Sequence, residues 1–130
     1  MLPVRICGLL GIVALIALPV TGSAQVPDSL PEGVTAQMIE TGAALYGGAG
    51  LCAVCHGANG EGSIGPDLAD DEWVHSDGSY DAIVHQILEG VPADKSESGV
   101  PMPPKGGATL TDEQVRAVAA YVWSLRFKES

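Results

Sequence analysis

Aromatic and basic residues are scarce in this sequence. Among 130 residues there are one Phe, two Trp and three Tyr, and six Lys and Arg stand against 16 Asp and Glu, giving a formal net charge of −10. Such an acidic surface repels nucleic acid and anionic membranes, so neither is expected as a partner. A small chain with so few large apolar side chains buries only a thin core. A bound apolar group would therefore supply part of the missing core.

Strand patterns and long apolar runs are lacking too. No segment alternates apolar and polar residues over the length of a strand, and there is no internal repeat. The longest apolar run, Ile6–Val20, is shorter than the roughly 20 residues that span a bilayer. It follows a short basic stretch that contains Arg5 and precedes the small residues Thr21–Ala24. This pattern predicts a signal peptide over residues 1–24, cleaved after Ala24, and export to the periplasm.

Retention of this segment as an N-terminal membrane anchor is the alternative. Cleavage would remove Arg5 and no acidic residue, leaving 106 residues with a net charge of −11. That length suits one domain, predicted over residues 34–130, behind a flexible arm at 25–33. The charge predicts redox protein partners with a basic docking patch, and association that slows as salt rises. Plain solubility explains most of these carboxylates equally well.

Cysteine is also rare, and two of the three cysteines stand in the run Cys52-Ala53-Val54-Cys55-His56. A Cys-x-x-Cys-His run is the attachment signature of c-type haem. Two thiols about one helical turn apart can add to the two vinyl groups of one porphyrin, and the adjacent imidazole can bind the iron. The run therefore predicts one covalent haem c, attached through Cys52 and Cys55, with His56 as an axial ligand.

A Cys-x-x-Cys pair also occurs in zinc sites and redox disulfides. A zinc site needs two further ligands, and the remaining candidates are Cys7 and the widely separated His75 and His85. A thioredoxin-like disulfide would need a βαβ context, whereas the flanks of this run are glycine-rich and helical. Haem attachment is therefore favoured over both.

Met102 is the predicted second axial ligand. It lies in Val100-Pro101-Met102-Pro103-Pro104, where three prolines fix the backbone around a soft thioether. A thioether ligand favours ferrous iron and raises the reduction potential. The alternatives are a histidine, either His75 or His85, or an open position. Met38 has ordinary helix-packing spacing and is expected in the core.

Four further residues are predicted around the cofactor. The second ring nitrogen of His56 needs an acceptor, and the carbonyl of Pro66 is a candidate, with Leu68 packing on the edge of the ring. Trp73 and His75 lie close together in the sequence, and His75 could donate to a haem propionate.

The spacing of apolar residues predicts three helices joined by irregular segments. The first covers residues 34–46 and can be capped by Thr35. The second covers residues 79–88. The last begins with a capping box made by Thr111 and Gln114.

These pieces together resemble the class I cytochromes c over nearly all of residues 25–130. The matching parts are Gly42 to Tyr46, the Cys-x-x-Cys-His run, Gly65-Pro66-Asp67-Leu68, Met102-Pro103-Pro104, and Leu110 to Gln114 with Tyr121-Val122. The stretch from Pro66 to Ser79 is also similar to the haem domains of the dihaem subunit of cbb-type oxidases.

The resemblance implies an all-α fold of three to five helices wrapped around one covalently attached haem. It implies a crossing of the first and last helices, with Gly42 close to Tyr121 or Trp123. It also implies Pro66 as the acceptor for His56 and Met102 as the axial ligand.

Motif and resemblance predict a periplasmic one-electron carrier, not an enzyme, between a dehydrogenase or quinol-oxidising complex and a terminal acceptor. One alternative is an electron-transfer subunit held permanently in a periplasmic dehydrogenase complex. Another is a haem enzyme or sensor with an open sixth position. It would need a distal acid–base pair, for which His75 with Asp71 or Asp77 is the nearby set.

Overall fold

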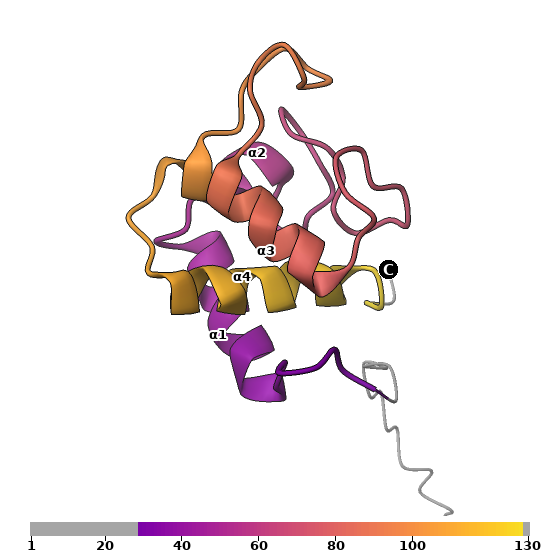
Figure 1. Cartoon of the computed structure of the whole chain (residues 1–130), viewed down its shortest axis with the longest axis vertical. Coiled ribbons are helices and arrows are strands. Elements are labelled where there is room, and N and C mark those ends of the chain that lie inside the picture. Colours follow the sequence, from indigo (N-terminus) through magenta and orange to yellow (C-terminus); the bar gives the residue numbers. More distant parts are fainter. Residues whose placement is uncertain (1–28, 129–130) are drawn as a thin grey trace, which may run out of the picture.

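The structure, a computed structural model, describes residues 29–128 and is built from helices and loops (Figure 1). The elements in chain order are α1 (Ala36–Gly47), α2 (Cys52–His56), α3 (Tyr80–Glu89), the 3-10 helix η1 (Pro104–Gly107) and α4 (Asp112–Leu125). No strand forms within residues 29–128, where the only β-type pairing is an isolated bridge between Val91 and Met102. The predicted all-α class is confirmed. The predicted signal peptide lies outside the described residues and stays a prediction.

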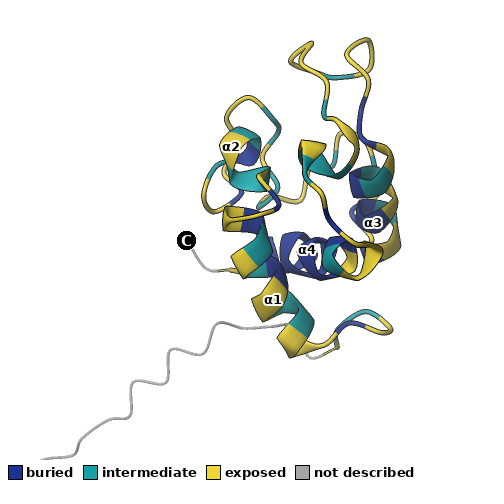
Figure 2. Cartoon of the chain, turned by 90° about the vertical axis from the view of Figure 1, so that its left-hand side faces the viewer, coloured by how far each residue is buried: buried dark blue, intermediate teal, exposed yellow. Residues whose placement is uncertain are grey.

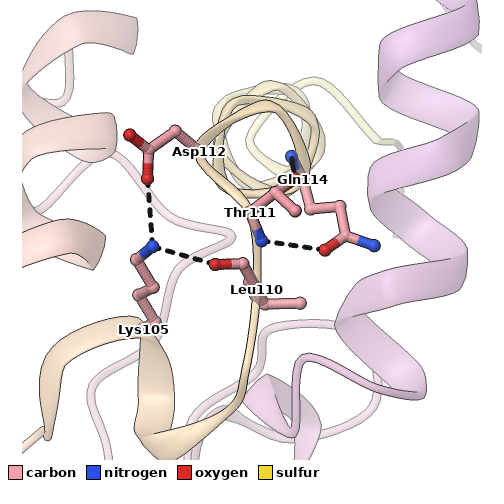
Figure 3. Close-up of polar contacts among 5 residues, drawn as sticks. All are labelled: Lys105, Leu110, Thr111, Asp112 and Gln114. Atoms are coloured by element: carbon pink, nitrogen blue, oxygen red, sulfur yellow. Dashed lines mark hydrogen bonds and ion pairs between the residues drawn. The ribbon is translucent and has the colours of Figure 1, made fainter.

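The three long helices begin at residues whose side chains cap them, and Thr35 and Thr111 were predicted in this role. The Thr35 hydroxyl accepts the Met38 backbone N–H at 3.2 Å, which starts α1, and Ser79 accepts the N–H of Ala82 at 3.3 Å, which starts α3. At the start of α4, Thr111 and Gln114 form the predicted reciprocal capping box (Figure 3). Each cap satisfies backbone N–H groups that the first helical turn leaves without partners.

The crossing of α1 and α4 is the main packing contact of the fold. A Cβ placed on Gly42 would collide with the backbone carbonyl of Ala117 and stand 2.9 Å from Cβ of Tyr121. The absence of a side chain at Gly42 therefore lets the two helices touch backbone to backbone. Next to this crossing, the rings of Tyr46 and Tyr121 lie with centroids 5.1 Å apart. The resemblance implied Gly42 against Tyr121 or Trp123, and Tyr121, with Ala117, is the neighbour found.

Helix α4 is the centre of the core. Apart from Arg116, every residue from Val115 to Leu125 is buried, which makes the helix the dark-blue element in Figure 2. Helix α3 packs its buried Ile83, Val84 and Ile87 on another part of α4. Met38 packs against this core from α1, as predicted. No helix within residues 29–128 has both the length and the apolarity to cross a membrane.

Two long loops complete the fold and carry much of the site. One runs from α2 to α3, and the other runs from α3 past Met102 to α4. The second forms a ten-residue projection, residues 92–101, closed at its base by the bridge between Val91 and Met102 (Figure 1, orange). The sequence predicted this whole segment as irregular, and η1 is a short addition to it. Lys105 and Gly106 within η1 have left-handed backbone angles, so η1 is a tight turn more than a helix.

Candidate haem site

The Cys-x-x-Cys-His run forms the short helix α2, which a tight glycine turn leads into. The backbone N–H groups of Gly48 and Gly50 both donate to the carbonyl of Leu45, at 3.2 and 2.8 Å. A Cβ on Gly50 would stand 2.7 Å from that same carbonyl oxygen. Leu51 then takes a left-handed conformation, with φ 58°, and caps α2. Small residues here allow the chain to reverse sharply between α1 and the two thiols.

The two thiols line the same cavity, one helical turn apart on α2. Cys52 is half-buried, and its thiol lies 3.4 Å from the carbonyl oxygen of Gly50. Burial raises the pKa of the Cys52 thiol above its ordinary value, which keeps the sulfur protonated at neutral pH. Cys55 is also half-buried, and neither cysteine forms a disulfide.

The imidazole of His56 is buried and held in one orientation. Its Nδ1 lies 2.9 Å from the carbonyl oxygen of Pro66, and because a carbonyl can only accept, Nδ1 carries the proton. In the neutral ring Nε2 then keeps its lone pair, the state that binds a metal. Gly65 lies against the ring so closely that a Cβ there would stand 2.6 Å from Cε1. The structure thus forms the hydrogen bond that was predicted between His56 and Pro66.

Met102 reaches the same cavity from the loop between α3 and η1. Its backbone is paired with Val91: the Val91 N–H donates to the carbonyl of Met102 at 2.8 Å, and the Met102 N–H donates back at 2.9 Å. Gly90 sits beneath this pair, where a Cβ would collide with the carbonyl of Met102 and stand 2.8 Å from the nitrogen of Pro104. The bridge and the neighbouring prolines fix the backbone of Met102 on both sides.

A single cavity brings these side chains together. The space in it that no protein atom fills amounts to about 1130 Å³, including its open mouth. The two cysteines, His56 and Met102 all line it, and its walls are apolar. The apolar wall residues include Leu68, Ile83, Ile87, Val91, Val118 and Val122. A pair of thiols, an imidazole with a fixed proton and a thioether around one apolar cavity are the donor set that haem c requires.

Trp73 and His75 also line this cavity, from the loop between α2 and α3. Trp73 is half-buried, and its buried Nε1 has no hydrogen-bond partner within residues 29–128. His75 is exposed at the mouth. The carboxylate of Asp77, a suggested partner of His75, instead accepts the backbone N–H of Ser79 at 2.9 Å. Within residues 29–128, His75 forms no hydrogen bond or ion pair with either Asp71 or Asp77.

The other possible ligands lie elsewhere. Met38 is packed against the core and does not line the cavity. His85 is exposed on α3, with its Nε2 3.1 Å from a carboxylate oxygen of Glu89. No group of three or more His, Cys, Asp or Glu side chains is arranged to hold a metal ion anywhere in residues 29–128. A zinc site built from such side chains thus has no ligand set there.

Tyr46, in the site, and Arg126, beside it, were missed as functional residues by the sequence analysis. Tyr46 was named only as part of the first helix, yet it lines the cavity and its hydroxyl donates to the carbonyl of Gly57 at 3.0 Å. Burial raises the pKa of this phenol well above its usual range. Arg126 was given no role in the site from the sequence. It donates to the carbonyl of Gly78 at 2.6 Å and lies 5.6 Å from the centroid of the Trp73 ring.

Fold and cavity define a protein like the class I cytochromes c. A structure search supports this: the crystal structure of cytochrome cL from the marine methylotrophic bacterium Methylophaga aminisulfidivorans matches with a TM-score of 0.54 and 26% identity, over 68% of this chain and 53% of that one. The family described as cytochrome c oxidase, cbb3-type, subunit III matches residues 37–122. The chain belongs to this family, and such a cytochrome c domain implies haem binding and electron transfer.

Similar curated proteins carry names consistent with this family. The cbb3-type cytochrome c oxidase subunit CcoP of Rubrivivax gelatinosus is 43% identical over 75 residues, which is 57% of this chain and 22% of that protein. The subunit FixPc of Rhizobium leguminosarum bv. viciae is 40% identical over 89 residues, 63% of this chain and 30% of that protein. The chain thus spans less than a third of the length of these relatives.

Proposed function

We propose that this chain is a periplasmic one-electron carrier that holds one haem c covalently through Cys52 and Cys55, with His56 and Met102 as axial ligands. The observation that supports it most is the convergence of these four side chains on one apolar cavity, with the His56 ring fixed by Pro66 at 2.9 Å. When bound, the haem supplies an iron that gains and loses a single electron.

In this proposal each of the four residues has its own role. Cys52 and Cys55 would hold the haem through two thioether bonds, each formed by addition of one S–H across one vinyl group. His56 presents the lone pair of Nε2 because its Nδ1–H is held by Pro66. Met102 presents a thioether from a backbone that the bridge to Val91 and the prolines hold rigid. With His56 and Met102 both on the iron, no position on it would be open to a substrate, so we propose no catalytic activity.

The rim of the cavity is the proposed contact surface for redox partners. Four large apolar side chains on this rim remain about half exposed, at 47–50%. They are Leu51, Ile64, Val74 and Val100, and all of them line the cavity. Electrons would pass between this chain and its partner at this rim. The net charge of −10 favours a partner with a basic patch around its own redox site.

A second candidate role comes from the named relatives. Because they are subunits of cbb3-type oxidases, the chain is also a candidate for an electron-transfer subunit held in a larger complex, such as an oxidase or a periplasmic dehydrogenase. Purification at high and low salt separates the two roles. A carrier that meets its partner electrostatically leaves it at high salt, whereas a permanent subunit stays bound.

Carbon monoxide binding to the reduced protein tests the axial assignment. With Met102 on the iron, the wild-type protein should not bind carbon monoxide readily and should show the weak long-wavelength absorption of thioether-ligated ferric haem. Met102→Ala should keep its haem, lose that absorption, fall in potential and bind carbon monoxide. Met38→Ala, a core methionine that does not line the cavity, is the matched control and should behave as wild type. Ready binding by the wild-type protein would contradict the proposal.

A further inference from the structure

Lys105 attaches the segment that carries Met102 to Leu110, which precedes α4, and to Asp112, the first residue of α4. Its ammonium Nζ donates to the carbonyl of Leu110 at 2.8 Å and lies 3.0 Å from a carboxylate oxygen of Asp112 (Figure 3). The lysine side chain is 29% exposed, whereas that of Asp112 is 73% exposed. The bond to Leu110 is therefore the better shielded contact, and the ion pair with Asp112 is partly screened by water.

The backbone of Lys105 is held in an uncommon conformation by the turn around it. It has φ 54° and ψ 27°, a left-handed conformation that side-chain-bearing residues seldom adopt. Gly106 follows in the same region, and its N–H donates to the carbonyl of Pro103 at 2.9 Å. The Ala108 N–H donates to the Lys105 carbonyl at 3.1 Å. This turn aims the lysine side chain back at Leu110 and Asp112.

Met102 and the residues that follow it are held differently. Backbone hydrogen bonds pair Met102 itself with Val91 through both its N–H and its carbonyl. On the C-terminal side, Pro103 and Pro104 have no N–H to donate, so they cannot anchor the backbone through one. The next residue, Lys105, anchors the segment through its side chain to the carbonyl of Leu110. Because Leu110 is 5% exposed and belongs to the hydrophobic core, this attachment ties the Met102 segment to the core.

We propose that Lys105 is a positioning residue for the axial methionine: its bonds to Leu110 and Asp112 keep the Met102 segment closed over the haem and limit how often the thioether leaves the iron. The inference rests on the proposed function, since it concerns the same site. Loss of the lysine contacts would raise the population of an open state without removing the ligand.

Competition by imidazole for the ferric haem measures that open population. Imidazole binds only when Met102 has left, so its apparent affinity rises in proportion to the open fraction. Lys105→Met keeps the apolar stem and removes the donor. It should bind imidazole about ten-fold more tightly, which corresponds to roughly 1.4 kcal/mol. Lys105→Arg retains a cationic donor and should recover most of the wild-type affinity.

Lys95→Met is the matched control. Lys95 is exposed on the projecting loop, and its replacement removes the same charge. It should stay within about two-fold of wild type, because one exposed charge is largely screened. Equal imidazole affinities for Lys105→Met and Lys95→Met would overturn the proposal. If Lys105→Met loses helix content, Lys105→Leu, which also lacks a donor, takes its place, and an affinity equal to wild type would overturn the proposal equally.

The same experiment distinguishes a failure of the proposed ligation. If Met102 does not bind the iron, the wild-type protein lacks the long-wavelength absorption and binds imidazole as tightly as Met102→Ala does. That result would contradict both proposals. If the wild type shows the absorption and Lys105→Met binds imidazole as weakly as wild type, only the role of Lys105 is contradicted.

Discussion

At the scale of single residues, the loop after α2 folds back so that its backbone surrounds His56. The N–H of Gly62 donates to the carbonyl of His56, and the N–H of Gly65 donates to that of Cys55, both at 2.8 Å. These bonds place the Pro66 carbonyl against Nδ1 of the ring. The orientation of the imidazole is thus set by backbone atoms, which a side-chain substitution elsewhere cannot easily displace.

The Glu61 carboxylate supports this loop, and we expect its contribution to depend on pH. Its Oε2 accepts the backbone N–H of Asn59 at 2.7 Å, and backbone hydrogen bonds hold the pKa of Glu61 below its ordinary value of 4.5. Because the folded pKa is lowered, the stabilisation is complete above pH 4.5 and is lost as the pH falls through the folded value. Glu61→Gln should therefore unfold more easily in urea at pH 7.

The acid limb of the stability curve provides the check on Glu61. In urea titrations from pH 7 to pH 3, the difference between wild type and Glu61→Gln should shrink as the carboxylate of the wild type takes up its proton. Glu40→Gln, which alters an exposed carboxylate on α1, serves as the control. A difference that stays constant over the whole pH range would show that Glu61 does not act through its charge.

The sequence picked out the thiols, the imidazole and the thioether that line one cavity, because haem chemistry would fix their types and spacing. Two thiols and an imidazole follow one another on one turn, and the thioether stands between prolines. Lys105 and Arg126 could not be predicted in this way. The first depends on a left-handed turn, and the second donates to Gly78, which is 48 residues away in the chain. Only the folded chain brings such partners together.

At the scale of secondary structure, the contact between α1 and α4 depends on Gly42. A methyl group there would press on the backbone carbonyl of Ala117, which belongs to the most buried helix and cannot move aside easily. Gly42→Ala should lower the free energy of unfolding by on the order of 2 kcal/mol, because overpacking outweighs the better helix propensity of alanine.

Gly47→Ala is the control for this packing argument. Gly47 closes α1, and a Cβ there would meet no atom within 4 Å. This substitution should leave the stability unchanged or raise it by up to about 1 kcal/mol, through the smaller entropy of the unfolded chain. Urea unfolding of both variants measures the difference. If Gly42→Ala proves as stable as Gly47→Ala, the close approach of α1 and α4 is wrong.

Helix ends were predictable because capping is local, as the bonds of Thr35, Ser79 and Thr111 show. The short helix α2 and the bridge between Val91 and Met102 were not. A five-residue helix is too short to display a period, and the bridge closes a loop whose sequence carries no strand pattern. The bridge forms because the chain between Val91 and Met102 folds back on itself.

At the scale of the whole molecule, the excess of negative charge should govern encounters with small redox reagents. With a net charge of −10, or −11 once residues 1–24 are removed, oxidation by a cationic metal complex should slow as salt rises, while oxidation by an anionic complex should accelerate. The effect should be largest between about 0.01 and 0.1 M salt, where the screening length falls from about 30 to 10 Å. Stopped-flow kinetics with both reagents measures it, and equal salt dependence for the two would contradict the electrostatic account.

The mass of the exported protein under denaturing conditions tests the central claim most directly. When the chain is produced in a host that attaches haem c, its mass should equal that of a polypeptide beginning at Gln25 plus one haem, and the double variant Cys52→Ala/Cys55→Ala should show the polypeptide alone. A wild-type mass without haem would contradict the account.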